Sequence, residues 1–341
     1  MLTALLTSFV LSLVLVLALA PVGIRFAWAV GYLDQPEARK LHTSATALLG
    51  GPVVFICAIA GWAVALTLAG RPPGSEAAYL VLGALVALAV GLWDDRFGMR
   101  PSVKLLGQGA AAVMVMASGA IPPLGLPVAL EVFITLVALV SLMNAVNFLD
   151  NMNGMVGGLA AVLLAGFAFT SWERGAVGVA AAQLALAGAC LGFLRYNFPA
   201  ARMFLGDAGS LFLGYSLGAS AVLAFRAAPA GWGRLGPLLM LSYPAFDMIF
   251  VVVSRLREGR KVYEGGKDHT NHRLSRVIQC PKRTVLLIWF SMAALCASGL
   301  VILRLNQPLP ALLLSGLWTA LFLWSGWKLS SIPAHPPRRP S

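Results

Sequence analysis

Two adjacent aspartates are the first candidates for chemistry, because they end an apolar stretch that is long enough to cross a membrane. These are Asp94 and Asp95, and Lys104 lies at the start of the next apolar stretch. Neighbouring carboxylates repel each other, so one pKa rises unless a cation lies close by. The two adjacent carboxylates therefore indicate a role in catalysis. The alternative is that they only form ion pairs with nearby arginines.

A second group of polar residues ends another apolar stretch. Asn144, Asn147 and Asn151 are spaced i, i+3 and i+7, which places them on one helical face. Asp150 and Asn153 lie beside them. Amides and a carboxylate can bind the donors and acceptors of a base or a sugar. The alternative is a set of polar contacts between membrane helices.

A glycine-rich segment with Asp207 and Ser210 opens a further apolar stretch. Glycines at a helix N-terminus can expose backbone N–H groups to an anion. An aspartate there can hold a divalent cation that is bound to phosphate. Asp207 or Ser210 as a simple helix cap is compatible with both interpretations.

An ionisable residue, Asp247, lies inside an apolar stretch three residues after Pro244. A charged group in such a position is a functional candidate by default, and the proline predicts a kink. The structural alternative is a buried aspartate paired with a neighbouring asparagine or arginine.

Two basic loops contain possible ligands for anions. Arg39, Lys40 and His42 precede Gly50 and Gly51, and glycines allow backbone to approach phosphate closely. The second loop contains three further candidates, which are His269, His272 and Arg273. With no cysteine or third histidine near them, the histidines fit phosphate binding better than metal binding. A solvated loop is the alternative in each case.

The elements that position these residues are membrane helices. The chain has 341 residues, of which 59% are hydrophobic and 11% charged, and this composition excludes an ordinary soluble or disordered protein. Apolar runs of about 20 residues predict an all-α polytopic membrane protein with about eleven transmembrane helices. The runs cover approximately residues 3–24, 47–69, 77–93, 103–121, 128–147, 155–172, 176–194, 209–225, 236–254, 285–303 and 309–328.

The distribution of charge predicts the orientation. With the N-terminus outside, 20 of the 25 lysines and arginines lie on the cytoplasmic side, together with ten of the 13 acids and all four histidines. This follows the positive-inside rule and places the C-terminus in the cytoplasm. The loops are too short for a separate soluble domain. We therefore expect one membrane domain, 1–329, and a cytoplasmic tail, 330–341. The net charge of +12 then indicates orientation and attraction to membrane lipid rather than nucleic acid.

Taken together and in order, these motifs resemble the polyprenyl-phosphate N-acetylhexosamine-1-phosphate transferases. The resemblance covers roughly residues 34–274. It rests on the motifs around Arg39 to Gly51, Asp94-Asp95, Asn144 to Asp150, Phe204 to Ser210, and His269 to Arg273. Each motif alone is modest, whereas five in the same order are specific.

The resemblance implies transfer of a sugar 1-phosphate, GlcNAc-1-phosphate above all, from a UDP-N-acetylhexosamine to undecaprenyl phosphate. UMP is released, and the reaction initiates a cell-envelope glycan. It further implies Mg²⁺ (or Mn²⁺), a homodimer, and an active site on the cytoplasmic face of the bacterial inner membrane. The catalytic candidates are Asp94, Asp95, Asp207 and His269, and the metal ligands are Asp207 and Asn147. The substrate-binding candidates are Arg39, Lys40, His42, Lys104, Asn144, Asn147, Asp150, Asn153, Asp247, His272 and Arg273.

The chain departs from the family pattern at three positions. Asn153 replaces a second carboxylate, and Ala47 replaces a proline. The basic loop reads His269-Thr-Asn-His272 instead of a run of histidines, which disfavours the related phospho-N-acetylmuramoyl-pentapeptide transferase. A secondary transporter or lipid flippase is the alternative from another class. It would require half-chain repeats and midplane charges, and we find no convincing repeat.

Overall fold

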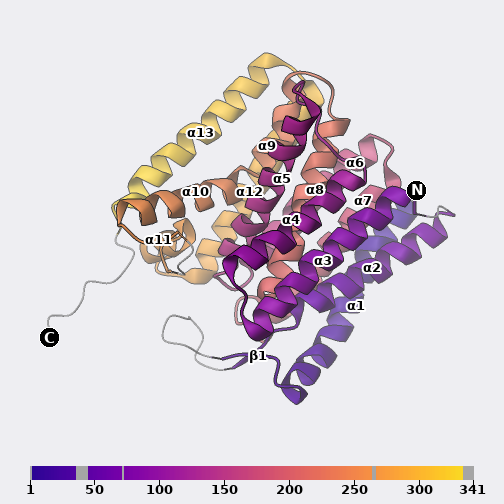
Figure 1. Cartoon of the computed structure of the whole chain (residues 1–341), viewed down its shortest axis with the longest axis vertical. Helices are drawn as coiled ribbons and strands as arrows, with labels where there is room; N and C mark the ends of the chain where they lie inside the picture. Colours follow the sequence, from indigo (N-terminus) through magenta and orange to yellow (C-terminus); the bar gives the residue numbers. More distant parts are fainter. Residues whose placement is uncertain (1, 36–44, 71–72, 263–265, 333–341) are drawn as a thin grey trace. The chain divides into compact units, whose positions relative to one another are not determined.

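The computed structural model describes residues 2–35, 45–70, 73–262 and 266–332. The described part of the chain folds almost entirely into helices and divides into two compact units, Met1–Ala228 and Pro229–Ser341 (Figure 1). Within the described ranges, nine helices are long and apolar enough to cross a membrane. The prediction of an all-α, multi-pass membrane protein is therefore confirmed.

Seven of these nine helices belong to the first unit. They are α1 (Leu2–Ala29), α2 (Gly50–Leu68), α3 (Ser75–Phe97), α5 (Val128–Leu149), α6 (Met155–Glu173), α7 (Val177–Asn197) and α8 (Gly206–Ala227). The predicted run at 103–121 forms the shorter helix α4 (Pro101–Ala117). In Figure 1, α3 and α4 run side by side.

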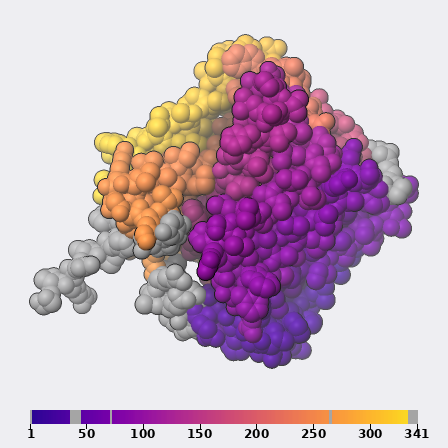
Figure 2. Space-filling view, in the orientation of Figure 1, coloured from indigo at the N-terminus to yellow at the C-terminus, as the bar shows by residue number. Residues whose placement is uncertain are grey.

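The central helix of the first unit is α8, which packs against α2, α3, α4, α5 and α6. Of its most apolar window, 83% is buried, compared with 28% for α1 and for α3. Accordingly, the visible surface of this unit in Figure 2 is formed mainly by the indigo to magenta helices α1 to α5. The polar first turn of α8 is therefore held by neighbours on several sides.

A short two-stranded sheet connects the start of α2 to the segment before α8. Strand β1 (Leu33–Asp34) pairs antiparallel with β2 (Thr46–Ala47), and Ala47 forms a parallel bridge with Met203. The N–H groups of Gly50 and Gly51 then donate to the carbonyl oxygens of residues 204 and 205, at 2.9 and 3.1 Å.

This arrangement corrects the prediction that Gly50 and Gly51 approach a phosphate. Their N–H groups are used inside the protein. A Cβ on Gly51 would collide with the backbone of Gly209, and one on Gly91 of α3 would collide with that of Ala208. These glycines therefore allow α2 and α3 to pack directly against the first turn of α8.

The second unit contains two further spans, α12 (Pro281–Leu305) and α13 (Pro308–Ser330). The predicted run at 236–254 is broken into α9 (Leu235–Met240) and α10 (Ser242–Arg257), which are bent by 62°. The break lies just before Pro244, so the kink that this proline predicts is confirmed. Proline is tolerated there because the first-turn N–H groups of a helix have no intrahelical acceptor. The one-turn helix η1 (Trp232–Arg234) precedes α9, and α11 (Thr270–Ile278) precedes α12.

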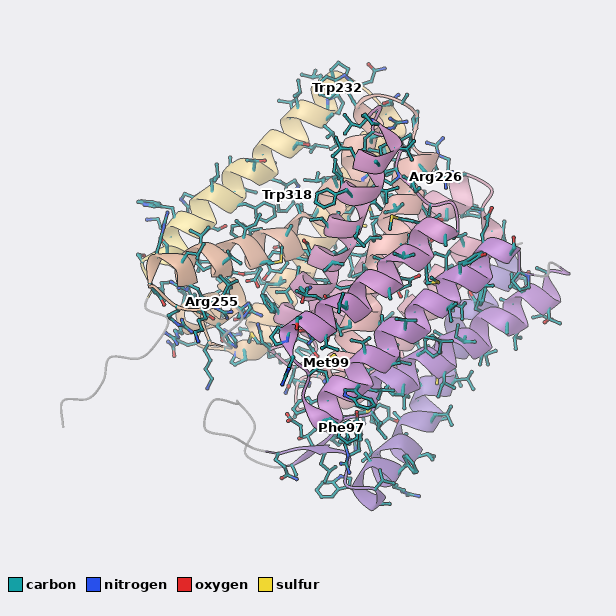
Figure 3. All side chains as sticks on the ribbon, in the orientation of Figure 1. Phe97, Met99, Arg226, Trp232, Arg255 and Trp318 are labelled. Carbon is teal, nitrogen blue, oxygen red and sulfur yellow. The ribbon has the colours of Figure 1, made fainter. Side chains whose placement is uncertain are left out.

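A buried ion pair holds the loop that follows α10. Arg255, labelled in Figure 3, donates through Nε and Nη2 to the two oxygens of Asp268, at 2.8 and 2.9 Å. Its Nη1 donates to the carbonyl of Val262, at 2.6 Å. Burial opposes ionisation of Asp268, but the hydrogen bonds and charge of Arg255 hold its pKa at about 2. The pair fixes the end of the loop next to the histidine segment.

We expect Arg255→Met to destabilise the protein by about 3–5 kcal/mol, because it leaves the buried Asp268 carboxylate without its main partner. Unfolding in detergent by heat or denaturant would measure the loss. Arg257→Met, at an exposed position on the same helix, should change stability by less than about 0.5 kcal/mol. A double variant with Asp268→Leu should recover much of the loss, and equal stability of all variants would contradict this role of the pair.

Candidate active site

Four helix ends bring the polar residues of the first unit together. The carboxyl ends of α3 and α5 meet the amino ends of α4 and α8, beside the α3–α4 turn where Phe97 and Met99 lie (Figure 3). We call the resulting group the acidic cluster. It consists of Asp94, Asp95, Lys104, Asn147, Asp150 and Asp207.

The ammonium group of Lys104 lies at the centre of the cluster. Its Nζ is 2.8 Å from Asp94 Oδ2 and 2.5 Å from Asp207 Oδ2. It also donates to Asn147 Oδ1, at 3.4 Å. Three helices thus each provide an oxygen atom to one cation, and among the described residues Lys104 is the only basic partner of these two carboxylates.

The two adjacent aspartates face different partners. Whereas Asp94 contacts Lys104, Asp95 accepts the backbone N–H of Asp207 at 2.8 Å and that of Ala208 at 3.1 Å. This differs from the expectation that the start of α8 is open to an external anion or is capped by its own Asp207 or Ser210. A carboxylate from α3 already accepts from two of its N–H groups.

Asn147 holds the side chain of Asp207 from the opposite side. Its Nδ2 donates to Asp207 Oδ1 and to Ser210 Oγ, both at 2.8 Å. Ser210 Oγ donates in turn to the carbonyl of Gly206, at 3.0 Å. Both carboxylate oxygens of Asp207 therefore have a partner, one on Lys104 and one on Asn147.

Asp150 follows the last residue of α5 and is half-buried. Burial and the negative charges of Asp207 and Asp95 raise the pKa of its carboxyl to about 8. Asp150 therefore resists ionisation beside these two carboxylates.

The side chain of Asn144 is hydrogen-bonded to another side chain of the protein. It exchanges two amide hydrogen bonds with Gln108 of α4, at 3.2 and 2.7 Å, and donates to the carbonyl of Val140 at 2.8 Å. Gln108 lies one turn after Lys104, and Asn144 one turn before Asn147. The amide pair therefore fixes the register in which Lys104 and Asn147 meet.

Asn153 lies in the turn between α5 and α6, and its Nδ2 donates to the carbonyl of Pro199, at 3.0 Å. Sequence reasoning missed Asn197, which accepts the N–H of Gly154 at 2.6 Å and donates to the carbonyl of Met203 at 2.9 Å. In the sequence, the only indication of a role for Asn197 is that it is a polar residue at the end of an apolar run. Asn197 ties this turn to the segment that leads into α8.

Three of the predicted substrate-binding residues, Arg39, Lys40 and His42, lie outside the described residues. The structure describes the strands on either side of them, where Leu33 pairs with Ala47 and Asp34 with Thr46.

In the second unit, Asp247 is fully buried and organises the start of α11. Its Oδ2 lies 2.8 Å from His269 Nδ1. Its Oδ1 accepts from the backbone N–H and the hydroxyl of Thr270, at 2.8 and 2.5 Å. The predicted catalytic histidine and the predicted substrate-binding aspartate are therefore brought together. Sequence reasoning missed Thr270, which directly follows His269.

Arg273 and His272 have surroundings that sequence reasoning did not anticipate. Arg273 donates to the carbonyls of Leu329, Ser330 and Ile332 at the end of α13, at 2.8 to 3.3 Å. Within the described part of the chain, both ring nitrogens of the buried His272 lack a hydrogen-bond partner. Burial and the charge of His269 lower the pKa of His272 to about 4.

The three carbonyl contacts of Arg273 connect α11 to the end of α13 and so stabilise the fold of this unit.

The oxygen atoms around Lys104 are of the kind that Mg²⁺ takes. Asp94, Asp207 and Asn147 offer carboxylate and amide oxygens to one point. Over the described ranges, no three His, Cys, Asp or Glu side chains are grouped closely enough to hold a metal by themselves. The oxygens of Asp94, Asp207 and Asn147 are thus of the ligand type that Mg²⁺ takes, and in the structure they surround the Lys104 ammonium.

By its fold and its site, the chain is a multi-pass membrane protein with an acidic cluster at the ends of its helices. The family model of glycosyl transferase family 4 matches residues 77–225, a range that contains the whole acidic cluster.

Three curated relatives cover most of the chain. One from Bacillus subtilis, described as "Probable undecaprenyl-phosphate N-acetylglucosaminyl 1-phosphate transferase", is 30% identical over 84% of this chain and 83% of its own length. The decaprenyl-phosphate N-acetylglucosaminephosphotransferase of Mycolicibacterium smegmatis is 32% identical over 87% and 80%. The undecaprenyl-phosphate alpha-N-acetylglucosaminyl 1-phosphate transferase of Escherichia coli K12 is 24% identical over 81% and 78%.

The chain therefore belongs to the glycosyl transferase family 4 enzymes, among the polyprenyl-phosphate N-acetylhexosamine-1-phosphate transferases that its motifs resemble. The motifs that carry the resemblance lie both inside the matched range, around the acidic cluster, and outside it, around His269.

The pKa of His272 predicts a specific sensitivity to acid. A histidine whose folded pKa is about 4 stabilises the folded state above its unfolded pKa of 6.5, and this contribution is lost as pH falls toward 4. At pH 5 the cost is about 2 kcal/mol. The loss of unfolding stability in detergent between pH 7 and pH 5 should therefore be smaller in His272→Leu. An identical loss in both proteins would contradict the assignment.

Proposed function

We propose that this chain transfers N-acetylglucosamine 1-phosphate from UDP-N-acetylglucosamine to undecaprenyl phosphate, releasing UMP. The single observation that carries the proposal is the acidic cluster, in which oxygen atoms of Asp94, Asp207 and Asn147 surround the Lys104 ammonium. The described activities of the relatives, transfer of N-acetylglucosamine phosphate to polyprenyl phosphates, agree with it. The product is the lipid-linked first unit of a cell-envelope glycan.

The reaction is balanced without a proton. An oxygen of the lipid phosphate attacks the phosphorus atom next to the sugar. A new P–O bond forms, the bond from that phosphorus to the bridging oxygen breaks, and the bridging oxygen leaves as part of UMP. The second pKa of a phosphate monoester is near 6, so that the lipid phosphate is largely a dianion at neutral pH. Two dianions react and two dianions result, and no general base is needed to create the nucleophile.

The main obstacle is repulsion between two anionic substrates, so the chain must supply positive charge and alignment. Lys104 offers an ammonium group at the cluster, where it can offset phosphate charge. Asp207 and Asp94, with the amide oxygen of Asn147, would hold Mg²⁺. When bound, Mg²⁺ would neutralise charge on the pyrophosphate of the donor.

The second unit contributes a separate pair of groups. Asp247 holds His269 and Thr270 at the start of α11. We propose that His269 binds an anionic group and that Asp247 holds His269 in place. Arg39, Lys40 and His42 stay predicted ligands of the substrate phosphates.

We place the enzyme in the bacterial inner membrane with the N-terminus outside and the C-terminus in the cytoplasm. The acidic cluster then faces the cytoplasm, where a soluble nucleotide meets a lipid headgroup. Eleven spans result if α4 and the bent pair α9 and α10 each cross the bilayer. The transferase occupies residues 1–329, residues 330–341 form a cytoplasmic tail, and the enzyme functions as a homodimer. The relatives do not favour the pentapeptide transferase or the transporter.

A UMP-release assay in detergent tests this function. With undecaprenyl phosphate, we expect more UMP from UDP-N-acetylglucosamine than from UDP-N-acetylgalactosamine or UDP-MurNAc-pentapeptide. Asp207→Asn should lower turnover by about 100-fold or more, because an amide keeps the shape but loses the charge that a hard cation requires.

The matched control is Glu76→Gln, which removes an acid from the opposite end of α3 and should remain near wild-type. Activity confined to UDP-MurNAc-pentapeptide, or no UMP from any donor in a folded preparation, would contradict the proposed function. A folded Asp207→Asn protein with normal turnover would contradict the role of Asp207.

A further inference from the structure

The first turn of α8 depends on a side chain from another helix. The residue before the helix, Leu205, has no side-chain hydrogen bond to the exposed N–H groups. Asp95 of α3 supplies the missing acceptors, since its two oxygens accept separately from the N–H groups of Asp207 and Ala208. The N-terminus of a helix carries a partial positive charge, so an ionised acceptor suits this position.

This contact directs both carboxylate oxygens of Asp95 toward the backbone of α8. Both of its carboxylate oxygens are bonded to N–H groups of α8, whereas Asp94 bonds the Lys104 ammonium. The adjacent residues therefore differ in the type of partner they bind, although the sequence presents them as a pair.

The same contact determines where the carboxylate of Asp207 lies. Its backbone N–H is held by Asp95, and its side-chain oxygens are held by Lys104 and Asn147. Loss of the backbone contact would allow the first turn of α8 to shift or fray and would carry the Asp207 side chain with it.

Gly206 shows how closely the two helices meet. Its φ of +68° lies in the region that favours glycine, and a Cβ at this position would lie 2.5 Å from Asp95 Oδ2. Any side chain at residue 206 would therefore displace the Asp95 carboxylate from the α8 N-terminus.

We propose that Asp95 is a positioning residue, which caps α8 from outside and so places the Asp207 carboxylate, while Asp94 acts at the substrates. The inference rests on the proposed function. It differs from the interpretation of the two aspartates as a joint catalytic pair, because it assigns Asp95 no contact with substrate and no proton transfer.

The first test compares two substitutions of Asp95 in the UMP-release assay. Asparagine retains one of the two accepting oxygens, so it can still accept one of the two N–H groups, but it cannot act as a base or as an anionic ligand. We expect Asp95→Asn to keep kcat within about tenfold of wild-type, and Asp95→Ala to lose roughly 10- to 100-fold. The Mg²⁺ concentration for half-maximal activity should rise in Asp95→Ala and less in Asp95→Asn.

The second test disturbs the contact without changing either aspartate. Gly206→Ala should lose at least about tenfold in kcat and should require more Mg²⁺. Its matched control is Gly98→Ala, because Gly98 has a φ of +69° but nothing within 4 Å of an added Cβ. The control also places an alanine at a positive φ but without the collision, and it should stay within about threefold of wild-type.

The outcomes separate this inference from the proposed function. Equal loss in Asp95→Asn and Asp95→Ala, or equal activity in Gly206→Ala and Gly98→Ala, overturns the positioning role while wild-type turnover stands. Failure of wild-type and Gly98→Ala to release UMP overturns the proposed function itself. Thermal unfolding of each variant in detergent identifies any loss that comes from failure to fold, and the Asp95→Asn comparison then decides the matter.

Discussion

The arrangement of the first unit depends on the balance between one ammonium group and four nearby carboxylates. Among the described residues of the acidic cluster, Lys104 is the only cation, and it contacts Asp94 and Asp207 directly. Asp150 has a raised pKa, and Asp95 is held by backbone N–H groups. A cluster of this kind is stable only if each of its charges has a partner.

The surrounding helices are built to hold this balance in place. The amide pair of Gln108 and Asn144 fixes the register of α4 against α5. Close packing at Gly51 and Gly91 holds α2 and α3 against the start of α8. The central position of α8 therefore serves the site. Asp207 lies in the first turn of α8, and this helix is packed against five others. Apolar packing in the unit and polar contacts at its end thus fix the same helix.

The sequence was sufficient to predict the helices and to select most of the cluster, because long apolar runs and acids at their ends are local signals. It could not distinguish Asp94 from Asp95, since their partners come from α4 and α8, and the α8 partners are far away in the chain. Asn144 and Gly51 were interpreted as ligand contacts for the same reason, and in the structure both bind other protein segments. The apolar run at 236–254 alone predicted one continuous span, whereas Pro244 predicted the bend that the structure shows just before it.

The central claim is that the oxygens around Lys104 form a site for a divalent cation together with the donor nucleotide. Binding of Mn²⁺ to the purified enzyme in detergent, measured by electron paramagnetic resonance in the presence of UDP-N-acetylglucosamine, tests it most directly. We predict saturable binding in the wild-type protein and in Glu76→Gln, and its loss in Asp207→Asn. Equal Mn²⁺ binding in folded Asp207→Asn would contradict the claim.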